Sequence, residues 1–349
     1  MSQNNVDNAY DIDAAWNDIV ATCNYNKDTQ FNLNVSYITA HSGYQCGVLG
    51  LDGCIYSPPA STYNYIMKID TSNDNITFFP SGLSASVDIG IRSGVLMPNG
   101  DIFFLPFSLG NKSITLKWDE KYTTPHVSDL SYSNAHGAVT FNGNIYYGGW
   151  KWGIRKYTYD TGAGMLLTSN SVAYQGAVLA PNKNVYLIAR EGGLSACIDT
   201  SNDSVSTVSC STTSTMCWGG CIAPTGFVYG IPRSGMWQKI NTNNNTSTII
   251  SQSAAGNYAC SGGVLLPNGY ILAVPSNTNS LFYCDTYNYS VGSLGSISSG
   301  NDGYFGGILT PANKIYMFPY KKNNVCVLTI TGLRHFTNNT CLSPFLNKF

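Results

Sequence analysis

One stretch of sequence decides the fold, Gly262-Gly263-Val264-Leu265-Leu266-Pro267-Asn268-Gly269-Tyr270-Ile271-Leu272-Ala273-Val274-Pro275, in which a tight turn joins two apolar runs. Pro fixes φ at the start of such a turn, and Asn and Gly tolerate the positive φ that closes it. A turn of this chemistry between two β-rich runs predicts a hairpin of two antiparallel strands.

The pair of small residues that opens this stretch recurs along the chain, with successive copies 40 to 47 residues apart. The seven pairs are Cys46-Gly47, Ser93-Gly94, His136-Gly137, Gly176-Ala177, Gly219-Gly220, Gly262-Gly263 and Gly306-Gly307. After each hairpin come a third run, often closed by Asp-Thr or Asn-Thr as at Asp70-Thr71, and a shorter fourth run. Four strands in about 43 residues is the period of a propeller blade. The sequence therefore predicts an all-β, seven-bladed β-propeller with four-stranded antiparallel blades.

The two ends of the repeat predict how the ring closes. Residues 31–37 alternate apolar and polar side chains, as a half-buried strand does, and they precede the first copy. The last copy supplies only a hairpin and one further run, residues 325–330. We therefore expect residues 31–38 to join the last blade as its outermost strand, which removes an exposed sheet edge.

The remaining segments lie outside the repeat. Residues 9–21 follow Asp7-Asn8, which can cap a helix, and carry apolar residues at helical spacing. We interpret residues 1–28 as an N-terminal extension with a short docking helix, whose attachment residues are Tyr10, Trp16 and Ile19. A helix that plugs one end of the ring is the equal alternative. Residues 29–335 form the propeller and residues 336–349 a C-terminal tail.

The third copy differs from the others and carries a resemblance. Residues 145–150 read Ile-Tyr-Tyr-Gly-Gly-Trp, with Gly-Gly where most copies have x-Pro. Together with outer runs that close in Asp-Thr, this resembles kelch-type repeats. The full Gly-Gly-x-Leu-x-Pro-Asn-Gly-x-Ile-Tyr-x-x-Pro unit, over residues 46 to about 335, is similar to repeats of uncharacterised bacterial, protozoan and bacteriophage propellers. The resemblance implies a fold but no activity. The Trp-Asp dipeptide of WD40 blades and the sialidase Asp box are absent.

Composition narrows the classes of partner. Only 11% of the 349 residues are charged and the net charge is −1, whereas about one-quarter of an ordinary soluble domain is charged. No basic field favours nucleic acid. The sequence has no basic n-region and no apolar run of membrane-spanning length, so we expect neither a signal peptide nor membrane insertion. Such compositions are associated with extracellular or virion assemblies.

The sequence shows few residues that could form a catalytic or metal-binding site. Glutamate occurs only at Glu120 and Glu191, in different blades, and most aspartates are explained by turns. A glycosidase needs two carboxylates across its substrate, so we expect no catalytic residues. The 11 cysteines show no disulfide or metal spacing, and we expect them reduced, with no metal and no cofactor. Of the four histidines, only His136 occupies a channel-facing column.

A binding surface remains. Loops that lead into the first strand of each blade and out of the second emerge on one face around the axis, and aromatic and Arg residues are favoured at binding hot spots. The candidate binding residues in these loops are Arg92, His136, Trp150, Trp152, Arg190, Trp218, Arg233, Trp237, Tyr304 and Tyr320. The alternative for each is packing between blades.

We therefore expect a non-enzymatic binding or structural propeller of a multi-subunit assembly, in particular a virion or phage tail component that is assembled in the host cytoplasm. Its loop face would contact other proteins of the assembly or a cell-surface glycan. The alternatives are a cytoplasmic kelch-like adaptor and, third, a propeller enzyme that acts on glycans or lactones.

Overall fold

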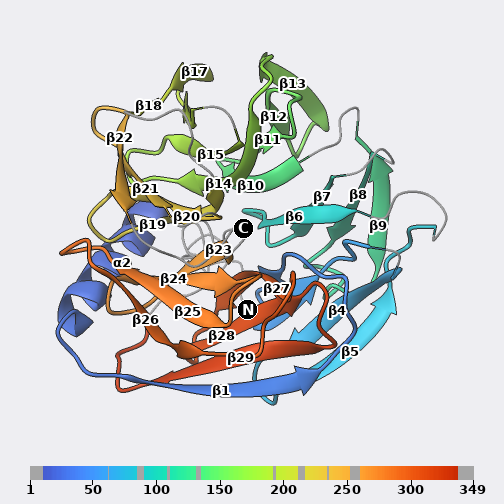
Figure 1. Ribbon diagram of the computed structural model, residues 1–349. Coiled ribbons are helices and arrows are strands. Elements are labelled where there is room, and N and C mark those ends of the chain that lie inside the picture. Colours follow the sequence, from blue (N-terminus) through green and yellow to red (C-terminus); the bar gives the residue numbers. More distant parts are fainter. Residues whose placement is uncertain are drawn as a thin grey trace.

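The computed structural model describes residues 11–61, 63–84, 90–107, 111–130, 135–191, 194–210, 217–233, 236–251 and 260–336, with the backbone alone for Glu191 and Ser251. Seven sheets are arranged around a common axis (Figure 1), which confirms the seven-bladed propeller. Blade 1 contains β2 (Val48–Leu49), β3 (Cys54–Ser57), β4 (Tyr65–Asp70) and β5 (Asn75–Pro80). Blade 2 contains β6 (Ile91–Leu96), β7 (Ile102–Pro106), β8 (Lys112–Leu116) and β9 (Pro125–Asp129). Blade 3 contains β10 (Ala135–Phe141), β11 (Asn144–Gly149), β12 (Ile154–Thr158) and β13 (Ala163–Thr168).

The remaining blades follow the same order from the axis outward. Blade 4 contains β14 (Ala173–Leu179), β15 (Val185–Glu191), β16 (Ala196–Asp199) and β17 (Ser204–Thr207). Blade 5 contains β19 (Cys217–Ile222), β20 (Val228–Pro232), β21 (Met236–Asn241) and β22 (Thr246–Ser251), and β18 (Ser209–Cys210) pairs parallel with β22. Blade 6 contains β23 (Cys260–Leu265), β24 (Tyr270–Pro275), β25 (Ser280–Asp285) and β26 (Val291–Ser296). Blade 7 contains β27 (Tyr304–Leu309), β28 (Lys314–Pro319), β29 (Asn324–Thr331) and β1 (Asn32–Thr39).

The Asp-Thr and Asn-Thr steps hold the third strand against the first hairpin. In four blades the Thr hydroxyl donates to a carbonyl in the turn between the first two strands. These bonds are Thr71 to Gly53 (2.7 Å), Thr200 to Lys183 (2.8 Å), Thr242 to Gly226 (2.9 Å) and Thr286 to Gly269 (2.7 Å). The preceding Asp or Asn accepts from the backbone two residues later, as at Asp70 and Ser72. The recurring dipeptide is therefore explained by turn geometry.

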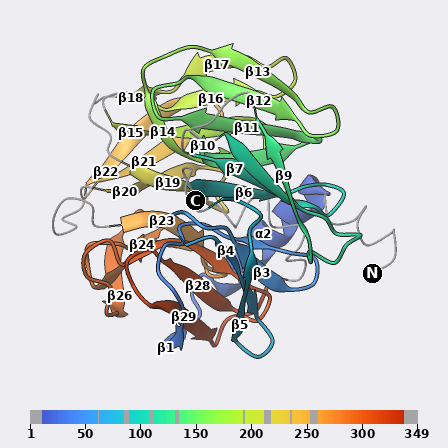
Figure 2. The ribbon, with the colours of Figure 1, turned by 90° about the vertical axis from the view of Figure 1, so that its right-hand side faces the viewer.

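The ring closes as the alternating pattern predicted. β1 pairs antiparallel with β29 along its whole length, from Asn32 opposite Thr331 to Thr39 opposite Asn324. The two strands lie side by side in Figure 1, and Figure 2 shows them together at the outside of the ring. A polar contact adds to this closure, since Asp74 of blade 1 accepts from Tyr316 and from Lys314 Nζ (2.7 Å) of blade 7. Tyr146 and Lys156 of blade 3 bind Asp203 of blade 4 in the same way, at 3.0 and 2.7 Å. The joint between the chain ends thus resembles a joint inside the ring.

The repeat register in blade 3 differs from the prediction by one residue. Val139 pairs with Tyr146, as Val178 pairs with Tyr186, so the small pair is Gly137-Ala138 and His136 precedes it. The reason is a shorter turn, because Phe141 pairs directly with Asn144. The two intervening residues both have positive φ, Asn142 at 48° and Gly143 at 71°, as a two-residue type I′ turn requires.

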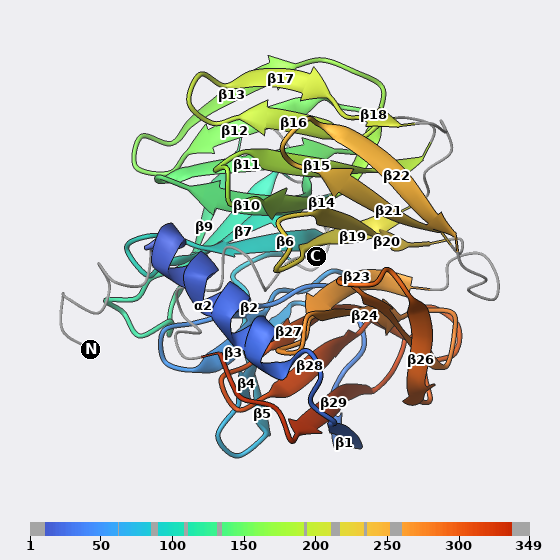
Figure 3. The ribbon, with the colours of Figure 1, turned by 90° about the vertical axis from the view of Figure 1, so that its left-hand side faces the viewer.

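The predicted N-terminal helix is present as α2 (Ile12–Asn26), whose N-cap Asp11 accepts from the Ala14 amide at 2.9 Å. Asp7 and Asn8, the predicted caps, lie outside the described residues. α2 crosses the end of the ring where the hairpin turns meet (Figure 3), and Cys23 and Asn26 contact the carbonyls of Leu266 and Pro267. Ile12, Ala15, Ile19 and Cys23 are buried in the largest apolar core. The helix therefore plugs one end of the propeller.

The cysteines serve mainly as buried core residues. None of the ten cysteines in the described part of the chain forms a disulfide, and all but Cys210 are buried. Burial raises the pKa of the thiols of Cys217, Cys221 and Cys260. Among the described residues, no helix is both long and apolar enough to cross a membrane.

Candidate functional site

The residue immediately before each small pair forms a ring of seven around the axis, which we call the lead ring. Its members are Gln45, Arg92, His136, Gln175, Trp218, Ser261 and Phe305. In blades 3 to 6, the pairing of the first two strands skips the lead residue and the glycine after it, while the partner strand skips one residue. Such a β-bulge redirects a side chain. Six of the seven are buried, and Arg92 is partly exposed.

Glycine is required beside this ring because backbones meet there. Gly137 and Gly176 have φ of 85° and 103°. A Cβ atom on Gly137 would lie 2.4 Å from the Cα of Gly176, and one on Gly176 would lie 2.7 Å from the Cα of Gly219. The innermost strands of neighbouring blades therefore touch through their glycines, and the lead residues project next to this contact.

A second ring, the trail ring, is formed by the residue five positions after the Ile or Val that is the first or second residue of the second strand in each blade. Its members are Ala60, Phe107, Trp150, Arg190, Arg233, Ser276 and Tyr320. Because the first two strands of a blade are antiparallel, both rings lie at the same end of the hairpins, opposite the turns that α2 covers.

Side chains of the two rings form a continuous axial cluster. The guanidinium carbon of Arg92 lies 3.8 Å from the centroid of the Phe107 ring, which in turn lies 4.0 Å from that of His136. The guanidinium carbon of Arg190 lies 3.9 Å from the Trp150 centroid and 5.0 Å from that of Trp218. The axial cluster is defined as Arg92, Phe107, His136, Trp150, Arg190, Trp218, Arg233, Phe305 and Tyr320.

The cluster reaches across the ring. Trp218 of blade 5 contacts Phe305 of blade 7, with ring centroids 5.4 Å apart, and Phe305 contacts Tyr320 at 4.8 Å. Blade 6 lies between them and contributes only the small residues Ser261 and Ser276 to the two rings. Large side chains from non-adjacent blades meet only near the axis, so this contact places the cluster there.

His136 is neutral at this position. It is 1% exposed, and burial, together with the positive charges of Arg92 and Arg190, holds the pKa of its imidazole well below the usual range. Neither ring nitrogen has a hydrogen-bond partner among the described residues. A neutral imidazole offers one donor and one acceptor, so His136 can serve both functions toward a ligand.

Other buried polar atoms at the axis also lack a hydrogen-bond partner among the described residues. Arg92 Nε, Gln175 Oε1 and Ser261 Oγ are buried and have no hydrogen-bond partner within the described part of the chain. Gln175 is 2% exposed and Ser261 is fully buried. Buried polar side chains in folded proteins are usually satisfied by protein or by ordered water. Four lead-ring residues, Arg92, His136, Gln175 and Ser261, therefore carry buried polar atoms without a partner among the described residues.

The structure brings seven of the ten predicted binding residues into this cluster, and it corrects two. Trp237 and Tyr304 are fully buried. Both residues belong to the largest apolar core, and the Tyr304 hydroxyl donates to Asn324 of the same blade. Trp152 is 60% exposed in the loop after β11.

Phe107, Gln175 and Phe305 belong to the same rings and were missed as binding residues. Two columns of the sequence repeat could have identified these three residues. Each lead residue directly precedes the small pair, and in blades 2 and 5 that position holds Arg92 and Trp218. In six blades the trail residue directly follows the x-Pro or Gly-Gly step. Aligning these two columns would have placed all three residues in the rings.

The predicted attachment residues differ in exposure. Ile19 is fully buried against the ring, so it contacts the propeller rather than a partner. Trp16 is partly buried and lines a hollow of about 250 Å³ beside Pro181 and Pro224. Tyr10 lies outside the described residues.

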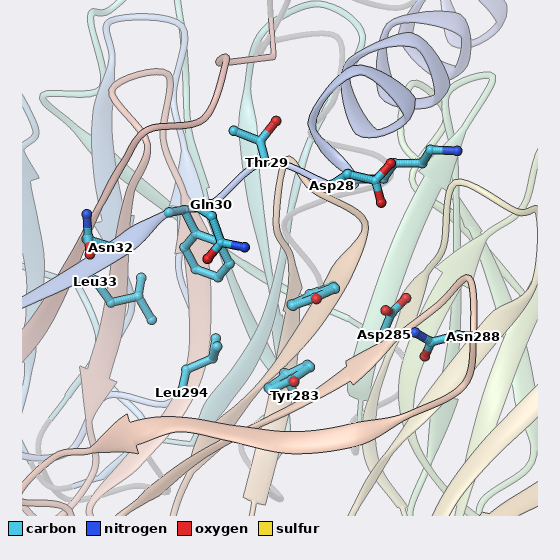
Figure 4. Close-up of a pocket in the computed structure, with 12 residues that line it drawn as sticks. Asp28, Thr29, Gln30, Asn32, Leu33, Tyr283, Asp285, Asn288 and Leu294 are labelled. Atoms are coloured by element: carbon cyan, nitrogen blue, oxygen red, sulfur yellow. The ribbon is translucent and has the colours of Figure 1, made fainter.

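A larger hollow lies away from the axis, beneath the segment that links α2 to β1. It has a volume of about 650 Å³. Asp28, Asp285 and Asn288 gather at one end and Leu33 and Leu294 at the other (Figure 4). The rings of Tyr270 and Tyr283, which also line it, stack with centroids 4.6 Å apart. None of its lining residues belongs to the axial cluster.

The two glutamates occupy separate places. Glu120 accepts from His126 at 2.7 Å in the turn between β8 and β9, and Glu191 ends β15 in blade 4. Within the described residues, no group of three or more His, Cys, Asp or Glu side chains could hold a metal ion.

Comparison with known proteins identifies the fold alone. No family model and no curated protein sequence matches the chain. A streptogramin B lyase is similar in structure, with a TM-score of 0.72 and 15% identity over 86% of this chain and 98% of that one. Virginiamycin B lyase from Staphylococcus aureus has a TM-score of 0.72 and 14% identity over 86% of this chain and 99% of its own. The WD40 repeats of RRP9 have a TM-score of 0.64 and 10% identity over 85% and 97%.

Proposed function

We propose that the chain is a non-enzymatic binding propeller that contacts its partner through the axial cluster. The observation that carries this proposal is the concentration of Arg and aromatic side chains in two rings at one end of the axis, next to buried polar atoms without partners. Aromatic and Arg residues dominate binding hot spots. The other end of the axis is covered by α2.

The proposal includes a place in a larger assembly, in particular a virion or phage tail. Composition supports it, since only 11% of residues are charged and neutral polar residues provide solubility. The kelch-like character of the repeat belongs to the same proposal and is supported by the Gly148-Gly149 step. Glycine is required at position 148, because a Cβ there would lie 2.6 Å from the Cβ of Tyr174.

Particle association tests this function. Particles purified from the native source should contain the chain, and recombinant chain should rebind particles from which it has been depleted. We expect Trp150→Ala to weaken rebinding by tenfold or more, about the loss of a hot-spot residue. Trp152→Ala is the matched control for the stability of the fold. This neighbouring tryptophan is 60% exposed, so its removal should leave the free energy of unfolding almost unchanged. A chain absent from particles, or rebinding unchanged in Trp150→Ala, would overturn the proposal.

An enzyme is the second candidate, and His136 is the observation that favours it. A neutral imidazole has a lone pair that can accept a proton from a substrate, and nearby arginines can stabilise the negative charge that develops on that substrate. The propeller of virginiamycin B lyase, one structure of which contains quinupristin, is similar in fold. Incubation of the chain with quinupristin, followed by mass spectrometry, distinguishes the two functions. Product that disappears in His136→Phe would establish catalysis, and unchanged quinupristin is the result we expect.

A further inference from the structure

We propose, as an inference that rests on the proposed function, that the axial cluster binds a carboxylate-bearing sugar at the end of a glycan. Arg92 receives the carboxylate, His136 and its neighbours in the lead ring bind hydroxyl groups, and the partly exposed aromatic residues of the trail ring flank the sugar.

Arg92 has the geometry of a carboxylate receptor. The Phe107 ring covers one face of its guanidinium, with the central carbon 3.8 Å from the ring centroid. The N–H donors lie in the guanidinium plane, so stacking leaves them available for a bidentate contact with a carboxylate. Its Nε has no partner among the described residues. None of the fourteen lead-ring and trail-ring positions is Asp or Glu, so these positions do not repel an anion.

The buried polar atoms fit hydroxyl groups. His136 offers a donor and an acceptor, Gln175 offers its amide oxygen, and Ser261 offers its hydroxyl. A sugar hydroxyl both donates and accepts, so a ring of hydroxyls can satisfy all three residues. A simple anion would leave the Gln175 acceptor without a donor. The combination of a stacked arginine with mixed donors and acceptors therefore indicates an acidic sugar.

The size of the cluster favours a single sugar over a protein surface. The cluster contains nine residues around one axis, whereas a standard protein interface uses about 20–30 residues on each side. Trp150 and Tyr320 are partly exposed, and aromatic rings of this kind bury the C–H face of a sugar. Trp218 and Phe305 meet near the axis and are themselves buried.

Calorimetric titration of the full chain tests the inference. Glucuronic acid and glucose form a matched pair that differs only in the carboxylate, and N-acetylneuraminic acid, acetate and an acidic peptide complete the set. We expect at least one acidic sugar to bind about tenfold or more tightly than glucose, acetate or the peptide. Arg92→Gln should weaken that binding by about tenfold or more, and Arg92→Lys, which keeps the charge but loses the planar fork, should also weaken it. Lys112→Gln removes a charge from an exposed ion pair on β8 and should change nothing.

The outcomes separate this inference from the proposed function. If neither acidic sugar binds more tightly than glucose, or if neither binds more tightly than acetate, the inference is overturned. Unchanged affinity in both Arg92 variants, when thermal melts show that they fold, would also overturn it. If Trp150→Ala abolishes particle rebinding but no acidic sugar binds or competes, the partner is not an acidic glycan and the proposed function stands. If Trp150→Ala leaves rebinding intact, the proposed function itself fails.

Discussion

His136 places two hydrogen-bonding nitrogens at a buried position where the described residues offer no partner. Leaving a buried polar group unsatisfied costs about 1–3 kcal/mol, whereas an apolar side chain of similar shape avoids this cost. Phe107 and Trp150 already surround the imidazole with aromatic rings, with centroids at 4.0 and 6.3 Å. An aromatic hydrocarbon would therefore suit the free protein at least as well as histidine does.

This leads to a prediction for His136→Phe. At pH 7 the variant should be as stable as the wild type or more stable by about 1–2 kcal/mol, because it removes the unsatisfied nitrogens. It should also lose affinity for the ligand. Urea denaturation, compared with ligand titration, measures both effects. A variant that is strongly destabilised would show that the nitrogens have partners that stabilise the fold.

The stability difference between the wild type and His136→Phe should depend on pH. Burial lowers the pKa of His136 in the folded protein, so the unfolded chain, whose histidine titrates near pH 6.5, binds the proton first as pH falls. The contribution of the neutral His136 to the free energy of unfolding is therefore fully present above about pH 6.5. Below that pH the contribution declines, by up to about 1.4 kcal/mol per pH unit. His136→Phe should lack this component, so its advantage should grow between about pH 6.5 and 5. A constant difference over this range would contradict the buried, neutral state.

The role of His136 could be predicted only in part from the sequence. Counting eight residues back from Ile145 places Gly137 in the second small position, as in the other copies. The structure shows a turn shortened to Asn142-Gly143, which moves His136 into the lead ring. Turn length is a backbone property that spacing alone does not fix, so a one-residue error there changed the interpretation of the side chain.

At the scale of elements, the closing strand was predictable and the role of α2 was not. Residues 31–37 alternate with period two, and only the last blade lacked a fourth strand. The helix could be expected from its spacing, but no pattern within it distinguishes a face that packs on its own ring from one that binds a partner. Trp237 and Tyr304 were misassigned for the same reason, because composition near a loop does not show which way a strand residue points.

Deletion separates the two N-terminal elements. Removing residues 1–38 should remove β1 and expose the edge of β29, and the chain should aggregate. Removing residues 1–20 should leave the ring closed and soluble, with a lower denaturation midpoint, because Ile12, Ala15 and Ile19 no longer cover the core. Size-exclusion chromatography and urea denaturation measure the two results. A soluble, folded chain without residues 1–38 would show that β1 is dispensable for closure.

For the whole molecule, the two ends of the axis have different roles. One end is sealed by α2 and carries the hairpin turns, while the other carries the lead and trail rings. Asn26 is the residue that ties the sealed end together. Its side-chain amide donates to the carbonyls of Pro267 and Arg334, both at 3.1 Å, and its oxygen accepts from the Arg334 amide at 3.0 Å. Helix, blade 6 and the segment after blade 7 therefore meet at one buried side chain.

Asn26→Ala tests whether this joint stabilises the ring. The variant removes three hydrogen bonds at a position with 0% exposure. It leaves the buried carbonyl of Pro267 and the part-buried backbone groups of Arg334 without these partners, so we expect a loss of about 2–3 kcal/mol in the free energy of unfolding. Asn24→Ala is the matched control on the same helix, because Asn24 is exposed and, among the described residues, accepts only from the Tyr287 hydroxyl at 3.2 Å. Its effect should stay within about 0.5 kcal/mol.

Axial ligand affinity should be unchanged in both variants, since the joint and the axial cluster lie at opposite ends of the hairpins. Equal, small losses in the two variants would show that α2 is held by its apolar face alone, and a change in axial affinity would show that the two ends of the axis are coupled.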